Sequence, residues 1–144
     1  MPLDLPPEPA AEVRPAPPVV HYAEGLAAGR FAIGLAPILA PELTLKLLGF
    51  PPEQDNPSAR MMARLFGVRD VGLGAIVLAS THEERALCRS FLLNGAMDLS
   101  DAAMISIPLI DRAGIDRAAG TSLGFALGGL SAWTVGWFWA DCTN

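Results

Sequence analysis

The chain has 144 residues, enough for one domain, of which 51% are hydrophobic and 17% are charged. Soluble proteins average about 25% charged residues, and the mean hydropathy here is +0.37, so the composition favours a membrane protein. The net charge of −5 and the absence of a basic cluster argue against a nucleic-acid partner.

The first 22 residues are rich in proline and are predicted to form an extended arm. They contain neither a basic stretch followed by an apolar stretch nor any other sign of a signal peptide. Proline-rich segments adopt polyproline-type conformations with a rise of about 3.1 Å per residue. The arm is interpreted either as a disordered tail or as a strap that lies along a partner.

A first apolar helix is predicted over residues 23–40 and is ended by Pro41. Residues 41–49 then form a short amphipathic helix that stops at Gly49. After a polar loop, Asn56 and Pro57 supply an N-cap and a first-turn proline for a second long helix, which runs to about Ser80.

Thr81 to Glu84 have the pattern of a capping box and are predicted to open a third helix over residues 82–110. A tight charged connection over 111–117 leads to a fourth segment, 118–140, which contains no charged residue. Residues 141–144 form a short tail.

Four apolar helices joined by short connections predict an all-α fold, a four-transmembrane-helix up-down bundle over residues 23–140. A soluble helical bundle is the alternative, disfavoured because the fourth segment is apolar all round. The single lysine among ten basic residues is typical of proteins from GC-rich bacteria. Together with the apolar helices, it predicts a location in the bacterial plasma membrane. The basic residues slightly favour termini outside the cytoplasm; they are Lys46, Arg60, Arg112 and Arg117 at one end against Arg14, Arg85 and Arg89 at the other.

Charged residues interrupt three of the four apolar segments. In a bilayer each would cost roughly 2.5–3.5 kcal/mol at the helix centre, so we expect them to pair with one another. The predicted intramembrane polar network consists of Arg30, Arg69, Asp70, Asn94, Asp98 and Asp101. Two arginines against three aspartates leave one excess negative charge, which a bound proton would neutralise. The network is interpreted either as structural salt bridges or as a proton, ion or substrate site.

Glycines at helical spacing predict close helix packing, either within the bundle or at a subunit interface. These glycines are Gly25, Gly29, Gly67, Gly74, Gly120, Gly124 and Gly128. Trp133, Trp137 and Trp139 are predicted to anchor the end of the last helix at the membrane interface.

No catalytic motif, metal-ligand pattern or cofactor fingerprint is evident, so no metal and no cofactor are expected. Cys88 and Cys142 are predicted to lie at the same end of the bundle. A disulfide between them is permitted if that end is outside the cytoplasm, and otherwise they remain thiols.

The pattern resembles a family of small, uncharacterised four-helix membrane proteins of bacteria and fungi, distantly similar to DoxX-like proteins. The residues that carry the resemblance are Arg30, Gly34, Pro41, the run from Ala63 to Asp70, Gly72 and Gly74. The resemblance covers residues 23–140 and implies no established activity. The proline-rich arm is not part of it.

Three functions are compatible with these features. The first is a non-enzymatic integral membrane protein, an accessory or assembly subunit of a larger bacterial membrane complex, whose partners are the lipid bilayer and other membrane protein subunits. The second is a small proton-coupled transporter or channel in which Asp98 and Asp101 titrate. The third is an intramembrane enzyme that uses the same carboxyls on a lipid-like substrate.

Overall fold

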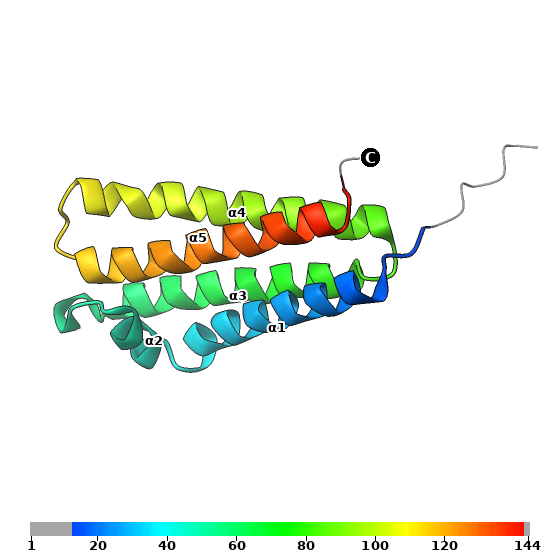
Figure 1. Ribbon diagram of the computed structural model, residues 1–144. Helices are drawn as coiled ribbons and strands as arrows, with labels where there is room; N and C mark the ends of the chain where they lie inside the picture. The colour runs from blue at the N-terminus through cyan, green and yellow to red at the C-terminus, as the bar shows by residue number, and fades with distance from the viewer. Residues whose placement is uncertain (1–12, 143–144) are drawn as a thin grey trace, which may run out of the picture.

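The computed structural model describes residues 13–142, and this part of the chain is helical and contains no strand. Its elements are α1 (Pro17–Leu39), α2 (Pro41–Leu48), the 3₁₀ turn η1 (Pro52–Gln54), α3 (Pro57–Ala79), α4 (Glu84–Ile110) and α5 (Asp116–Trp139). The four long helices alternate in direction, so the start of α1 and the end of α5 lie at the same end of the bundle, as Figure 1 shows. The predicted all-α class is confirmed.

Helix α1 begins earlier than the sequence indicated. It starts at Pro17, with Ala16 extended, so the last residues of the predicted arm are helical. Just before it, the Val13 carbonyl accepts a hydrogen bond of 3.0 Å from the Glu84 amide at the start of α4. Residues 1–12 of the arm and residues 143–144 of the tail lie outside the described residues.

Local sequence signals set most of the helix boundaries. The Asn56 side chain accepts a hydrogen bond of 3.0 Å from the Ala59 amide and Pro57 takes the first helical position, as predicted for α3. Gly49 ends α2 with a φ of 95°, a left-handed conformation that glycine adopts without steric cost.

The predicted capping box at the start of α4 is wrong. Helix α4 begins at Glu84, and its N-cap residue Glu83 makes no side-chain capping bond. The Thr81 hydroxyl instead donates to the Leu78 carbonyl at 2.8 Å, so it belongs to the end of α3. A threonine hydroxyl can donate to a preceding backbone carbonyl or accept from a following backbone amide. Here it donates to a carbonyl at the end of α3.

The bundle consists of two helix pairs, α1 with α3 and α4 with α5, and contacts within each pair are more numerous than contacts between them. Gly34 and Gly67 bring α1 and α3 together: a Cβ atom on Gly34 would lie 2.7 Å from the Gly67 carbonyl oxygen, and a Cβ on Gly67 would collide with the Gly34 carbonyl oxygen. Gly74 continues this contact, since its Cβ would lie 3.2 Å from the Ala27 carbonyl oxygen. Small residues therefore bring these two backbones into contact.

Most of the large buried apolar side chains gather at the end of the bundle that holds the start of α1 and the end of α5, while Leu73 of α3 and Leu45 of α2 are buried outside this group. This core contains Val19, Ala23, Ala27, Val77, Leu87, Phe91 and Trp133. Between α4 and the first two-thirds of α5, the buried apolar residues are alanines: Ala102, Ala118, Ala119 and Ala126. The helix pairs are thus joined by apolar packing mainly at one end.

Large apolar side chains also cover the outside of the bundle. Leu39 and Ile110 are each 78% exposed, and Phe138 is 68% exposed. In the described chain no helix by itself has the length and apolar character required of a membrane span, whereas α1 and α2 meet that requirement together, with a bend of 115° at the break between them.

Five of the seven glycines predicted to pack have no packing role within the described chain. A Cβ atom at Gly25, Gly29, Gly120, Gly124 or Gly128 would meet no atom within 4 Å. The α5 glycines of this group are exposed on the outer side of the helix. The alternative that they lie at an interface with another subunit stays a prediction.

The glycine contact between α1 and α3 yields a prediction for stability. We expect Gly67→Ala to lower the melting temperature, because a methyl group forced against the Gly34 carbonyl would cost about 1–3 kcal/mol, as in other overpacked cores. The matched control is Gly72→Ala in the same helix, where the added Cβ meets nothing within 4 Å and alanine's higher helix propensity should hold or raise the melting temperature. Equal effects of both substitutions on thermal unfolding would contradict this account.

Candidate functional site

Arg30 of α1 lies at the centre of the candidate site. Its side chain is almost completely buried, with 7% exposure for the residue. The guanidinium donates from Nη1 to Asp70 Oδ1 on α3 at 3.1 Å, from Nε to Asn94 Oδ1 on α4 at 3.1 Å, and from Nη2 to Asp98 Oδ1 on α4 at 2.7 Å. One side chain therefore ties α1 to α3 and to α4, across the boundary between the two helix pairs.

Asp98 carries the connection on to α5. Its second oxygen, Oδ2, accepts a hydrogen bond of 2.9 Å from the Trp133 indole nitrogen, and the Trp133 ring stands 5.4 Å from the Arg30 guanidinium carbon in a cation–π contact. Gly129 of α5 makes room for this carboxylate, because a Cβ atom there would collide with Asp98 Oδ2. Both oxygens of Asp98 are thus engaged by the protein.

A second ion pair, between Arg69 and Asp101, lies beside the first. Arg69 of α3 donates in a bidentate manner to Asp101 of α4, with distances of 2.8 Å and 2.6 Å. Its Nη2 atom also stands 3.6 Å from Asp70 Oδ1, which links the two ion pairs into one cluster. The Arg69 side chain is 30% exposed, and its guanidinium lies over the Phe66 ring at 4.5 Å. This pair is therefore partly accessible from outside, unlike Arg30.

The structure brings all six residues of the predicted polar network together, and below we call them the charged cluster: Arg30, Arg69, Asp70, Asn94, Asp98 and Asp101. Asn94 orients Arg30 while its own amide nitrogen donates to the Ser90 carbonyl at 2.9 Å. The helical spacing of Asn94, Asp98 and Asp101 on α4 was the signal that placed three of these on one face.

Of the three tryptophans predicted to lie at the end of the last helix, Trp133 takes a different position from the one predicted. Trp133 is only 3% exposed and belongs to the core and the charged cluster, so its predicted role as an interface anchor is corrected. Trp137 packs partly buried against the same core. Trp139 is 52% exposed, and its ring meets Tyr22 of α1 edge-on at 5.5 Å. Trp133 lies inside the bundle because Asp98 offers its indole N–H a buried acceptor.

Four members of the charged cluster are enclosed by protein, since Arg30, Asp70, Asn94 and Asp98 are each at most 7% exposed. A cavity of about 340 Å³ lies nearby along α4 and α5, lined by apolar side chains that include Phe91, Leu99 and Leu130. Asp98 is not among its lining residues, and Asp98 itself is 3% exposed. Among the described residues, no three His, Cys, Asp or Glu side chains are arranged to hold a metal ion.

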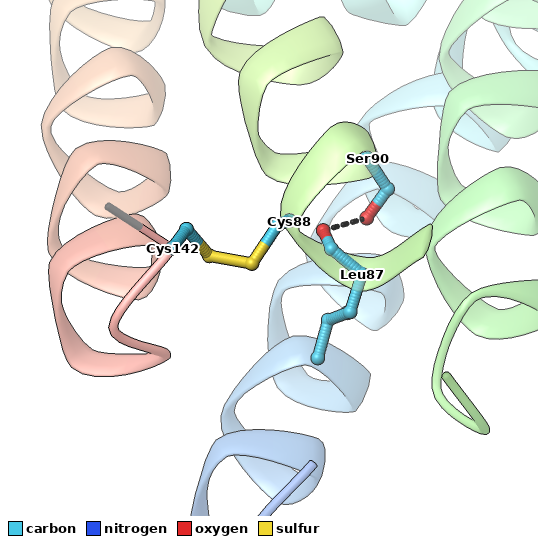
Figure 2. Close-up of a disulfide and its surroundings, with 4 residues drawn as sticks. All are labelled: Leu87, Cys88, Ser90 and Cys142. Atoms are coloured by element: carbon cyan, nitrogen blue, oxygen red, sulfur yellow. Dashed lines mark hydrogen bonds between the residues drawn. A yellow bond between two sulfur atoms is a disulfide. The ribbon is translucent and has the colours of Figure 1, made fainter. Parts of the chain in front are cut away.

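A disulfide closes the end of the bundle that holds both chain ends. Cys88 on the first turns of α4 is bonded to Cys142, which follows α5 directly, with the two Cα atoms 5.6 Å apart (Figure 2). Beside it, the Ser90 hydroxyl donates within α4 to the Leu87 carbonyl at 2.8 Å, so the Ser90 side chain is not bonded to the charged cluster. The disulfide fixes the end of α5 to α4.

At the opposite end, Asp55 and Arg60 hold the loop before α3. Arg60 donates from Nε and Nη2 to the two Asp55 oxygens at 2.6 Å and 2.7 Å. These hydrogen bonds hold the pKa of Asp55 below its ordinary value, against a smaller opposing effect of desolvation. Because the pKa is lowered in the folded chain, any stability from this pair is present above the ordinary carboxyl pKa and is lost as the pH falls through the lowered one.

The fold and the cluster define a class: small all-α proteins in which two antiparallel helix pairs are joined through a buried, charged side-chain cluster. Residues 27–139 match the family described as a domain of unknown function, DUF4267, and the chain belongs to this family. All six residues of the charged cluster, and Trp133, lie within the matched range. Neither the curated proteins nor the solved structures include a match to this chain. No activity is carried over from the family.

The charged cluster yields a prediction for stability. Arg30→Gln should destabilise the fold by about 3–5 kcal/mol, because it leaves the Asp98 carboxylate buried without its cation and removes the donor to Asp70. Arg30→Lys should cost less, since the charge stays but the planar, forked donor geometry is lost. Arg64→Gln on the exposed side of α3 is the control and should leave thermal unfolding unchanged. If Arg64→Gln lowered the melting temperature as much as Arg30→Gln, the role given to Arg30 would be refuted.

Proposed function

We propose that this protein is a non-enzymatic integral membrane protein of the bacterial plasma membrane and serves as an accessory or assembly subunit of a larger membrane complex. The observation that carries the proposal is the inverted distribution of polarity. Arg30, Asp70 and Asp98 are buried, while large apolar side chains such as Leu39, Ile110 and Phe138 are exposed. Exposed large apolar side chains, when they gather into patches, are typical of surfaces that meet lipid or another protein.

The role as a subunit is supported by the outer side of α5. Gly120, Gly124 and Gly128 form an exposed ridge that no part of the described chain contacts. Glycines at this spacing permit close approach of a neighbouring helix in a membrane. Asp70 and Asp98 are buried, and neither lines the apolar cavity along α4 and α5, so an intramembrane enzyme has less support than a subunit.

The proposed orientation places both described chain ends outside the cytoplasm. The Cys88–Cys142 disulfide lies at this end, and disulfides persist in oxidising compartments such as the bacterial periplasm. The other end carries the basic residues Lys46, Arg60, Arg112 and Arg117, and basic residues are enriched in cytoplasmic loops. Both features support the same orientation.

The subunit proposal predicts a stable complex. After mild detergent extraction from its native membrane, the protein should appear in native mass spectra bound to one or more other membrane proteins at a fixed stoichiometry. Gly124→Leu, which places a bulky side chain on the exposed ridge, should reduce that association. The control is Phe125→Leu, at an exposed position of α5 about 100° around the helix from Gly124. A protein that always runs alone as a monomer would refute the proposal.

The orientation predicts how the disulfide reacts. In intact cells, a membrane-impermeant reductant followed by an impermeant maleimide should label Cys88 and Cys142. A cysteine introduced at Ala113, in the connection between α4 and α5, should be labelled only after the membrane is permeabilised. If position 113 were labelled in intact cells while Cys88 and Cys142 were not, the opposite orientation would be indicated.

A further inference from the structure

One carboxylate oxygen of the charged cluster has no hydrogen-bond partner. Asp70 is completely buried, with 0% exposure. Its Oδ1 atom receives the Arg30 bond, while its Oδ2 atom is buried and receives none. Asp98 and Asp101 differ from it, because both oxygens of each accept hydrogen bonds from the protein.

The charges around Asp70 do not balance if every carboxyl is ionised. Arg30 faces it from α1, Arg69 is its neighbour on α3, and Asp98 and Asp101 approach from α4. From α5 the cluster receives the neutral indole of Trp133. Two guanidinium groups thus meet three carboxyls, which leaves one excess negative charge in a buried setting, where an uncompensated charge is costly.

We infer that Asp70 is a proton-binding site, which holds one proton on Oδ2 and thereby makes the charged cluster electrically neutral. The unpartnered oxygen identifies Asp70 as the carrier, because an unsatisfied neutral O–H is less costly to bury than an unsatisfied half of a carboxylate. A metal cation fits less well, since hard cations take six or more oxygen ligands and a single oxygen is free here. The transport hypothesis had named Asp98 and Asp101, but both are fully engaged.

Loss of this proton would act on the boundary between the helix pairs. Arg30 donates to neutral Asp70 at 3.1 Å and to Asp98 at 2.7 Å, so its stronger bond now runs to α4. An ionised Asp70 would compete with Asp98 for the same guanidinium and would draw it toward α3. Proton binding at Asp70 therefore strengthens the link between α1 and α4. The inference does not depend on a membrane location, because the burial of Asp70 comes from the protein's own helices.

The proton is detectable directly in the unmodified protein. Infrared spectra of the purified full chain at pH 7 should contain the carbonyl stretch of one protonated carboxylic acid, which shifts when aspartate carboxyls are labelled with carbon-13. Asp70→Asn should abolish this band. Absence of the band from the wild-type protein, or its persistence in Asp70→Asn, would overturn the inference.

Thermal unfolding supplies a second, independent measurement. Asparagine mimics a neutral aspartic acid in shape and charge, so Asp70→Asn should keep the wild-type melting temperature at pH 7. Asp98→Asn is the matched control, the same chemical change in the same cluster, and should lower the melting temperature because Arg30 and Trp133 lose their shared ionised acceptor. If Asp70→Asn lowered the melting temperature as much as Asp98→Asn does, the result would indicate that Asp70 is ionised and would overturn the inference. Failure to find a partner subunit would leave both measurements unaffected.

Discussion

The bundle depends on the burial of one cation, the Arg30 guanidinium. A charge removed from water must be surrounded by acceptors, and Arg30 finds them on α3 and α4 at once through Asp70, Asn94 and Asp98. Asp98 then engages Trp133 on α5. All four long helices are therefore tied to a single point, in a fold whose two helix pairs have few other contacts between them away from the core at one end.

Close backbone packing makes this arrangement possible. Gly34 and Gly67 bring α1 and α3 into direct contact, which sets the reach of Arg30 toward Asp70. On α5, Gly129 leaves the space that Asp98 occupies, so that a carboxylate and an indole can meet between two tightly packed helices. The glycines and the charges thus form one structural unit, since a larger residue at either place would displace a buried ion pair from its partners.

The two ends of the bundle differ in chemistry. One end holds the aromatic core and the Cys88–Cys142 disulfide, which fixes the end of α5 to α4. Toward the other end the buried apolar residues of α4 and α5 are alanines, and this end carries the Asp55–Arg60 pair and the short helix α2. Between them, the exterior is apolar and the interior is charged. Arg30, Asp70 and Asp98 are buried there, while large apolar side chains such as Leu65 and Leu99 are exposed.

The sequence by itself determined the helical class, the boundaries marked by Gly49, Asn56 and Pro57, and the membership of the charged cluster, because helical spacing and the cost of burying charge are local or compositional properties. Only the tertiary structure decided which partners pair, that Trp133 is an inner donor, that Thr81 bonds backward to α3, and that Cys88 meets Cys142. It also separated the glycines that pack within the chain from those left exposed on α1 and α5. The physical reason is that spacing fixes the face of a helix on which a residue lies, whereas its partner depends on how that helix is rotated and shifted against its neighbours.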